Sequence, residues 1–318
     1  MVRRMRCNKG KWPTPQIARR PCWRIPLVGL LAVIFLFSFT KLTLYGIRAY
    51  QNQERQEGLS SQHDEALRQA QALGTDTFTT IVPSVPKVEM AAVQAKTPFI
   101  ETSARKAFFK VIGLTQDSLK AFVKQNNDTV GWLTIEGLVD HPVLYRDNSY
   151  YLTHDFDRLH NACGALFVDE NTPIHSNTQN LLIYGHNMKD GSMFGRLLKY
   201  TGNDYLRNHY TVQFDTRFEN FTYIIFAVCQ VSADGTNQKG LDFTGHASFA
   251  DEAGFNAYID KVYEQSLYSR YLDVKYSDTL LALVTCIDND RLVLVARRQR
   301  DNETESDIRH CLLGLFTR

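Results

Sequence analysis

The chain has 318 residues, of which 44% are hydrophobic and 22% are charged, so most of it can bury a core and it is not a disordered chain. Its net charge of +2 argues against a nucleic-acid partner. The charge is unevenly spread, since residues 1–24 hold eight Lys or Arg and no Asp or Glu, whereas the remainder holds 28 basic and 34 acidic side chains.

Residues 25–47 form an apolar stretch of 23 residues that is interrupted by one charge, Lys41. A helix rises about 1.5 Å per residue, so this stretch can cross a hydrocarbon core about 30 Å thick. A cleaved signal peptide is the alternative, but the stretch is longer than a usual signal core and no small-residue cleavage site follows it. We therefore predict a single transmembrane helix with residues 1–24 in the cytoplasm and the rest outside, which excludes a cytosolic enzyme.

Residues 48–103 are expected to form an extracellular linker or stalk. The part from 48 to 73 is rich in Gln, Glu and Arg and predicts a solvated helix or coil. The part from 74 to 103 contains three prolines, which oppose a long helix.

A globular pattern begins near residue 104 and extends to residue 298. Thr115 is the expected N-cap of a helix through Gln125, and Ser248–Asp251 matches a capping box before a second helix. Eight short β-type runs, bounded by Gly, Asn, Asp or Pro, predict a sandwich or closed barrel. These runs are 131–135, 142–145, 165–168, 180–184, 211–214, 221–231, 280–285 and 292–296. Residues 299–318 form a charged and then apolar tail to which the pattern assigns no role.

The six cysteines form no CxxC pair, and no His/Cys cluster has zinc-ligand spacing, so we expect no metal. Four of them lie in the predicted exterior portion, where disulfides are permitted, and their pairing is left open.

His186 and Asn187 follow an apolar strand that ends at Gly185. A strand end positions a reactive group on a rigid element while the following loop leaves it accessible. A surface histidine without a chemical role is the alternative, and it describes most of the nine histidines.

Cys286 ends the buried strand pattern of 280–284, and Arg291 opens the next strand after a polar loop. A hairpin with this loop sets Cys286 nearly opposite Arg291. A cation beside a cysteine favours the thiolate, which is the nucleophilic form, although a lone cysteine is more often an inert buried residue. Arg297 and Arg298 are rivals for the cationic role, but Arg297 lies about 20 Å further along the strand at ~3.3 Å per residue.

Five segments together resemble the class B sortases, membrane-anchored cysteine transpeptidases of Gram-positive bacteria. The resemblance covers roughly residues 126–296 and is most specific in YGHNMKDGSMFG, which begins at Tyr184. The other segments are NNDTVGWLTIEG (126–137), HPVLYRDNSYYLTHDF (141–156), GALFVDEN (164–171), and VTC followed by RLVLVA. The resemblance implies a mainly β fold, an eight-stranded β-barrel with peripheral helices and a helix between the sixth and seventh strands.

The resemblance also implies the site residues: His186 as the catalytic histidine, Cys286 as the nucleophile and Arg291 as the arginine. Thr285 and Asn187 are candidate substrate contacts. This sequence departs from the family's TLxTC pattern at its first Thr, where Ala282 stands, and its loop from Cys to Arg is shorter than in some relatives. Neither departure removes a reacting group.

The implied reaction is acyl transfer without a cofactor. The enzyme cleaves a C-terminal sorting motif after Thr, forms a Cys thioester and transfers the surface protein to a peptidoglycan precursor amine. Class B relatives favour Asn-Pro-x-Thr signals. The expected location is the cell membrane, with the catalytic domain (104–298) extracellular.

Three alternative functions remain open. A pilus-type sortase joins protein subunits, and a secreted cysteine protease uses water as the acceptor, although papain-like enzymes have Cys before His and this chain has His186 before Cys286. A membrane-tethered surface protein that retains only the barrel is the third.

Overall fold

The computed structural model describes residues 24–72, 117–174, 178–202, 205–232, 241–268 and 272–316. Residues 1–51 and 52–318 form two compact units. The expected linker at 74–103 and the expected N-cap Thr115 lie outside the described residues.

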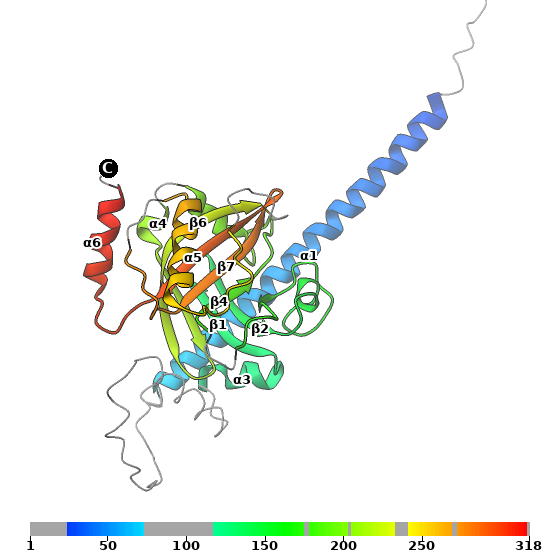
Figure 1. Ribbon diagram of the computed structural model, residues 1–318. Coiled ribbons are helices and arrows are strands. Elements are labelled where there is room, and N and C mark those ends of the chain that lie inside the picture. Colours follow the sequence, from blue (N-terminus) through cyan, green and yellow to red (C-terminus); the bar gives the residue numbers. More distant parts are fainter. Residues whose placement is uncertain are drawn as a thin grey trace, which may run out of the picture. The chain divides into compact units, whose positions relative to one another are not determined.

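Eight strands close into a barrel in the order β1-β2-β3-β4-β7-β8-β6-β5 (Figure 1). The barrel is one of the two architectures that the eight β-type runs predicted, and the one that the resemblance implied. The pairs β2–β3 and β4–β7 are parallel, and the other pairs are antiparallel. The parallel pairing of β4 with β7 matters most for function, because it sets side by side the ends of two strands that are separated by 95 residues in the chain. The bounds are β1 Thr129–Ile135, β2 Val139–Tyr145, β3 Leu166–Val168, β4 Asn180–Tyr184, β5 Thr211–Thr216, β6 Asn220–Ser232, β7 Leu280–Ile287 and β8 Asp290–Arg298.

Helices lie around the barrel and in its connections. The helix α5 lies between β6 and β7 in the chain and packs its apolar face, which includes Phe255, Ile259 and Val262, against the barrel. Its N-cap is Asp251, whose Oδ1 accepts a hydrogen bond from Gly254 N over 2.8 Å. The capping box expected to start at Ser248 is therefore wrong, because the helix begins three residues later. The helical bounds are α1 Arg24–Ala72, α3 Asp117–Gln125, η2 Tyr150–Leu152, η3 Gly195–Thr201, α4 Tyr205–Asn208, α5 Glu252–Gln265 and α6 Glu305–Phe316.

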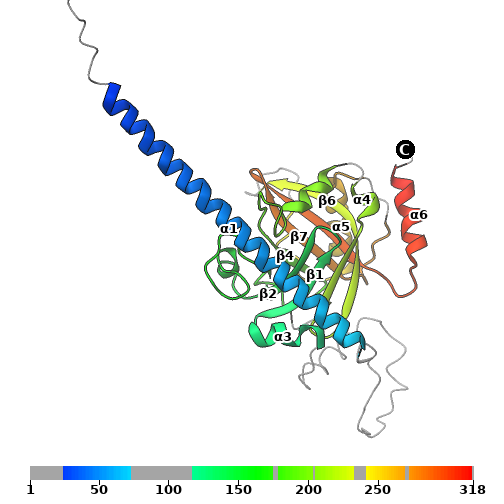
Figure 2. The ribbon, with the colours of Figure 1, turned by 180° about the vertical axis from the view of Figure 1, so that it is seen from behind.

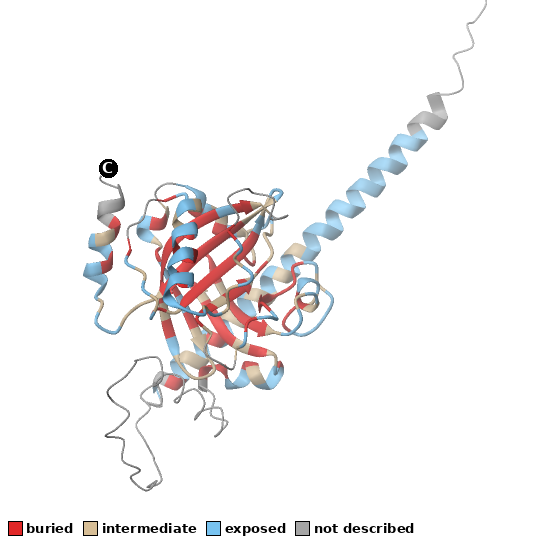
Figure 3. Ribbon diagram, viewed as in Figure 1, coloured by how far each residue is buried: buried red, intermediate tan, exposed pale blue. Residues whose placement is uncertain are grey.

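Buried residues lie along the barrel strands (Figure 3), and their apolar side chains form the main core. A second cluster lies between α3, β1 and the segment before β3, and in it the rings of Phe122 and Trp132 lie 4.8 Å apart. The C-terminal tail, for which the sequence indicated no role, forms α6 and buries Ile308 and Leu312.

By length and composition α1 can cross a bilayer, since it contains an 18-residue stretch with a mean hydropathy of 1.9, none of which is buried. Within the second unit the same helix continues from Asn52 to Ala72 across β1 and β2 (Figure 2). His63 is 2% exposed there and stacks on Trp132 at 4.0 Å between ring centroids. The segment expected to be solvated from 48 to 73 is helical through Ala72, but from Asn52 onward one of its faces packs on the barrel.

Candidate active site

Three neighbouring strands carry the candidate reactive groups to one end of the barrel. In the antiparallel ladder of β7 and β8, Cys286 lies directly opposite Arg291, the pairing expected from the hairpin. The turn is tighter than the expected four-residue loop, because Ile287 and Asp290 still pair and only two residues connect them. Asp288 adopts φ 49° in this turn, a left-handed conformation that Asp tolerates better than most residues.

His186 reaches the same end from β4. The parallel ladder pairs Tyr184 with Val284, and Gly185 N donates to Val284 O over 3.1 Å. Continuing this register by two residues sets His186 level with Cys286, on the same face of the sheet. The imidazole, the thiol and the guanidinium therefore come from adjacent strands at one level.

The turn that carries His186 depends on glycine at position 185. A Cβ there would lie 2.5 Å from Leu166 Cδ2 and 2.7 Å from Phe194 Cδ2, closer than real Cβ contacts allow. The loop then folds back on itself, since Phe194 N donates to His186 O over 2.9 Å and Asn187 forms an isolated bridge with Met193. His186 thus lies on a loop that is held by its own hydrogen bonds and that packs against Leu166 and Phe194 at Gly185.

The imidazole of His186 has a partner that sequence reasoning missed. Its Nε2 lies 2.8 Å from the carbonyl oxygen of Leu152, in the 3-10 turn η2. A carbonyl oxygen can only accept, so in this arrangement Nε2 carries the hydrogen and Nδ1 is the nitrogen that can gain or lose a proton. A backbone carbonyl leaves no side-chain signal in a sequence, which is why this contact could not be found there.

Tyr184 is a second group that the sequence did not single out. It lies two residues before His186 on the same strand, so it faces the same side of the sheet. Burial raises the pKa of its hydroxyl, and the nearby Asp169 carboxylate raises it further, whereas the positive charge of Arg291 opposes the rise. The charge of Arg291 therefore acts on the Tyr184 hydroxyl, on the strand that leads to His186.

The two candidate substrate contacts differ in their surroundings. Asn187 is partly exposed, and its Nδ2 donates to the carbonyl oxygen of Cys286 over 2.8 Å. Thr285 is 2% exposed, and its Oγ1 has no hydrogen-bond partner among the described residues. Strand alternation points the Thr285 side chain away from the face that carries Cys286.

The rival arginine Arg297 lies elsewhere. It is 0% exposed, Nε donates to Asp273 O over 2.8 Å, and the guanidinium pairs with Glu303. These contacts hold the start of the C-terminal tail against the barrel. Arg298 stacks over the ring of Phe221, with its guanidinium carbon 4.0 Å from the centroid.

Cys286 differs from the other cysteines by its accessibility. The four cysteines in the described part of the chain are free thiols; Cys163 and Cys229 are buried, Cys311 is intermediate and Cys286 is exposed. An exposed thiol at a strand end, opposite Arg291 and at the level of the strand end that leads to His186, can perform nucleophilic acyl transfer.

The sortase domain profile matches residues 134–299, which contain all of these groups. The chain belongs to the sortase family. Its sequence is 36% identical to the sortase B of Listeria monocytogenes over 178 residues, which are 55% of this chain and 70% of that protein. It is 28% identical to the sortase B of Staphylococcus aureus over 181 residues, 55% of this chain and 71% of that protein.

Solved structures of class B sortases share the fold. The sortase B of Bacillus anthracis in complex with AAEK2 superposes with a TM-score of 0.55 at 25% identity, over 65% of this chain and 100% of that chain. The Listeria monocytogenes sortase B gives a TM-score of 0.50 at 35% identity, over 56% of this chain and 99% of that one. This sortase is accordingly a cysteine transpeptidase of class B, and the pilus-type and protease readings are not favoured. Sortases act on proteins with sorting motifs and work at the membrane or cell surface.

Proposed function

We propose that this sortase cleaves a surface protein after the Thr of a C-terminal sorting motif and transfers it to a peptidoglycan precursor amine, with Cys286, His186 and Arg291 as the catalytic residues. The observation that supports these roles is that Cys286 lies opposite Arg291 in the β7–β8 ladder, while the β4–β7 register, continued two residues past Tyr184, brings His186 level with Cys286. Each group serves a different need of acyl transfer, namely a nucleophile, a proton carrier and a cation.

In the first step the Cys286 thiolate attacks the Thr carbonyl carbon. The C–S bond forms, the peptide C–N bond breaks, and His186 gives a proton from Nδ1 to the departing amine. In the second step an incoming amine gives its proton to His186 and attacks the thioester, so that a C–N bond forms and the thiolate leaves. Arg291 stabilises the negative charge that develops on the carbonyl oxygen in both steps.

Asn187 is proposed to contact the sorting motif, whereas Thr285 is not, because its side chain is buried and points away from the face that carries Cys286. Asn187 lies between the His186 loop and the Cys286 carbonyl. Thr285 lies directly before the nucleophile, and its buried hydroxyl lacks a partner among the described residues. Thr285→Val should therefore leave KM for the peptide unchanged, and a raised KM in Thr285→Val beside a wild-type KM in Thr285→Ser would place Thr285 in the substrate site after all.

We propose that α1 anchors the enzyme in the cell membrane as a single span over residues 25–47, with residues 1–24 in the cytoplasm and residues 104–298 outside. The basic residues before the apolar stretch support this orientation. Anchoring brings the enzyme and a lipid-linked acceptor to one membrane face, which raises their effective concentration. Protease treatment of intact protoplasts should digest the barrel domain, and a fully protected barrel would contradict the orientation.

The reaction is tested with the full-length protein in detergent, Asn-Pro-x-Thr peptides with x randomised, and triglycine as the amine. Mass spectrometry should detect a product cleaved after Thr and joined to triglycine. The product should be absent from Cys286→Ala and from His186→Ala. Hydrolysed acid without ligated product would contradict the transpeptidase proposal.

A further inference from the structure

We infer that Asn52 and Arg55, on the helix that leads away from the apolar segment, are positioning residues for His186. They hold the loop at residues 153–164, which is continuous with the Leu152 carbonyl that fixes the imidazole. This inference rests on the proposed role of His186 as the proton carrier. All of its contacts lie within residues 52–318.

The link begins at Leu152. Because its carbonyl accepts the Nε2 hydrogen of His186, a displacement of Leu152 changes the orientation of the ring and frees the choice of tautomer. A misplacement of about 1 Å in a catalytic group can cost roughly 100-fold in rate. The rate therefore depends on whatever holds Leu152 in place.

Backbone hydrogen bonds tie Leu152 to the following loop. Ala165 N donates to Tyr151 O over 2.9 Å, and Asn161 N donates to Thr153 O over 2.8 Å. The two neighbours of Leu152 in the chain, Tyr151 and Thr153, are thus hydrogen-bonded to residues 165 and 161 at the other end of the loop. Leu152 therefore moves together with residues 161–165.

Arg55 holds the middle of the loop. Its Nη1 lies 2.8 Å from Asp155 Oδ2, and its Nη2 pairs with Asp157. The Asp155 side chain is only 7% exposed, and its other oxygen accepts from the backbone N of Asp157 and of Leu159 over 3.1 and 3.0 Å. One buried carboxylate therefore joins the helix to the backbone of the loop.

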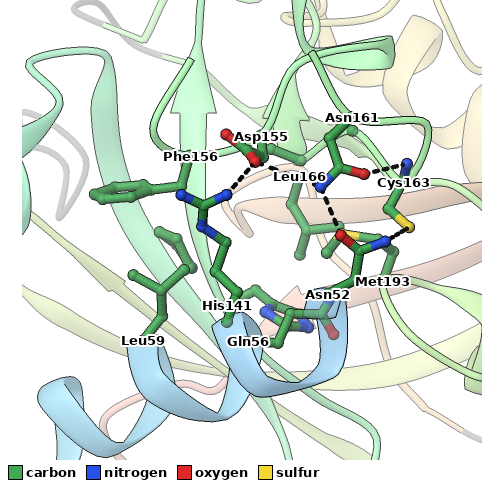
Figure 4. Close-up of a pocket in the computed structure, with 14 residues that line it drawn as sticks. Asn52, Gln56, Leu59, His141, Asp155, Phe156, Asn161, Cys163, Leu166 and Met193 are labelled. Carbon is green, nitrogen blue, oxygen red and sulfur yellow. Dashed lines mark hydrogen bonds and ion pairs between the residues drawn. The ribbon is translucent and has the colours of Figure 1, made fainter. Parts of the chain in front are cut away.

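Asn52 holds the end of the loop (Figure 4). Its Nδ2 donates to the Cys163 sulfur over 2.9 Å, and its Oδ1 accepts from Asn161 Nδ2 over 2.8 Å. Asn161 in turn accepts from Cys163 N over 3.0 Å. Asn161 also bonds to Thr153 through its backbone N, and Thr153 directly follows Leu152 in the chain. Two hydrogen bonds, through Asn161, therefore connect the side chain of Asn52 to the residue next to Leu152.

The helix has a second attachment that does not involve this loop. His63 stacks on Trp132 of β1, and Ser60 hydrogen-bonds to Asp140 of β2. A small cavity lies between the helix and the barrel beside Asn52, lined by His141 and Met193 among others. Removing the Arg55 side chain therefore removes its ion pairs with Asp155 and Asp157 but leaves no hole in a close-packed core. The helix stays attached to the barrel through His63.

The test uses the full-length protein in detergent with the peptide and triglycine assay. Arg55→Ala should lower kcat roughly 10- to 100-fold with little change in KM, and it should shift the pH optimum of kcat, because the environment of His186 changes. Arg55→Lys keeps the charge and should restore part of the rate. Arg68→Ala is the matched control, since Arg68 is an exposed arginine on the same helix and should match the wild type.

A double-mutant cycle then separates positioning from stability. Arg55→Ala and Asp155→Asn should lower kcat by similar factors, and the double variant should be no slower than either. If Arg55→Ala does not fold, Asn52→Ala provides the same readout from the other end of the loop. Wild-type kcat and pH optimum in a folded Arg55→Ala variant, or an equal loss in Arg68→Ala, would overturn the inference.

His186→Ala distinguishes this inference from the proposed function. Activity retained in His186→Ala would contradict the role of His186, and with it the proposed function. An inactive His186→Ala beside a fully active Arg55→Ala would contradict only the positioning role.

Discussion

The side-chain amide of Asn187 donates to the backbone carbonyl of Cys286 over 2.8 Å. This bond joins the loop that carries His186 to the strand end that carries the nucleophile. The last backbone hydrogen bond between the two strands is made by Gly185. Beyond it, the Asn187 bond sets the distance between His186 and Cys286, which are 100 positions apart in the chain. The amide thus has a positioning role besides its proposed contact with substrate.

We expect Asn187→Ala to lower kcat about tenfold, in line with a hydrogen bond worth about 1 kcal/mol net and some misplacement of His186. Asn187→Asp should lose as much, because a carboxylate cannot donate to the Cys286 carbonyl. Steady-state kinetics with peptide and triglycine measure this. A full rate in Asn187→Asp would show that donation to the carbonyl is unimportant.

Arg291→Ala and Arg297→Ala should fail in different ways. Arg291→Ala should leave the melting temperature close to that of the wild type and lower kcat/KM by at least about 100-fold, the loss typical of removing an oxyanion-stabilising group. Arg297→Ala leaves Glu303 without its buried partner and should cost about 3–5 kcal/mol of folding free energy. Thermal melts and activity per folded molecule separate the two effects, and comparable losses of activity per folded molecule would show that Arg291 is the wrong arginine.

The barrel was predictable because its strands alternate or are continuously apolar and end in turn residues. The eight runs match β1 to β8 to within a few residues at each end. The hairpin of β7 and β8 is local, so the spacing of Cys286 and Arg291 was enough to place them opposite each other. The match of His186 with Cys286 needed the family resemblance, because nothing in a single sequence reports which distant strands pair.

The rest depended on contacts without a local signal. The helix from Asn52 to Ala72 is polar enough to predict a solvated stalk, and its attachment through His63 and Trp132 joins residues 69 positions apart. The N-cap of α5 was misplaced because Ser248 and Asp251 both suit a cap, and packing of the helix against the barrel decides between them.

Cys286 should be the only cysteine of the described residues that forms an acyl adduct. Cys229 is 0% exposed, and burial raises its pKa to about 12, so almost no thiolate exists at pH 8. Burial also raises the pKa of Cys163. Mass spectrometry of acid-quenched enzyme with peptide alone should locate the thioester on Cys286, and Cys163→Ala, Cys229→Ala and Cys311→Ala should still form it. An adduct on any of those three cysteines would contradict the assignment of the nucleophile.

His141 should make the folded state sensitive to mild acid. Burial lowers its pKa from 6.5 to about 4, against the opposing effect of Asp140, and the positive charge of Arg196 lowers it slightly further. The unfolded chain therefore binds a proton at a higher pH than the folded one, so this contribution to stability is complete above pH 6.5 and is lost as the pH falls from about 6.5 to 4. The loss amounts to about 3 kcal/mol.

The comparison that isolates this effect is wild type against His141→Gln, which cannot take up a proton. Urea unfolding of both proteins is measured at several pH values between 7 and 4. Carboxyl groups that titrate near pH 4 contribute equally to both proteins and cancel in the difference, so the wild type should lose about 3 kcal/mol more than the variant over this range. Parallel curves would mean that His141 remains able to bind a proton in the folded state, and hence that the cavity beside Asn52 admits enough water to solvate the charged ring.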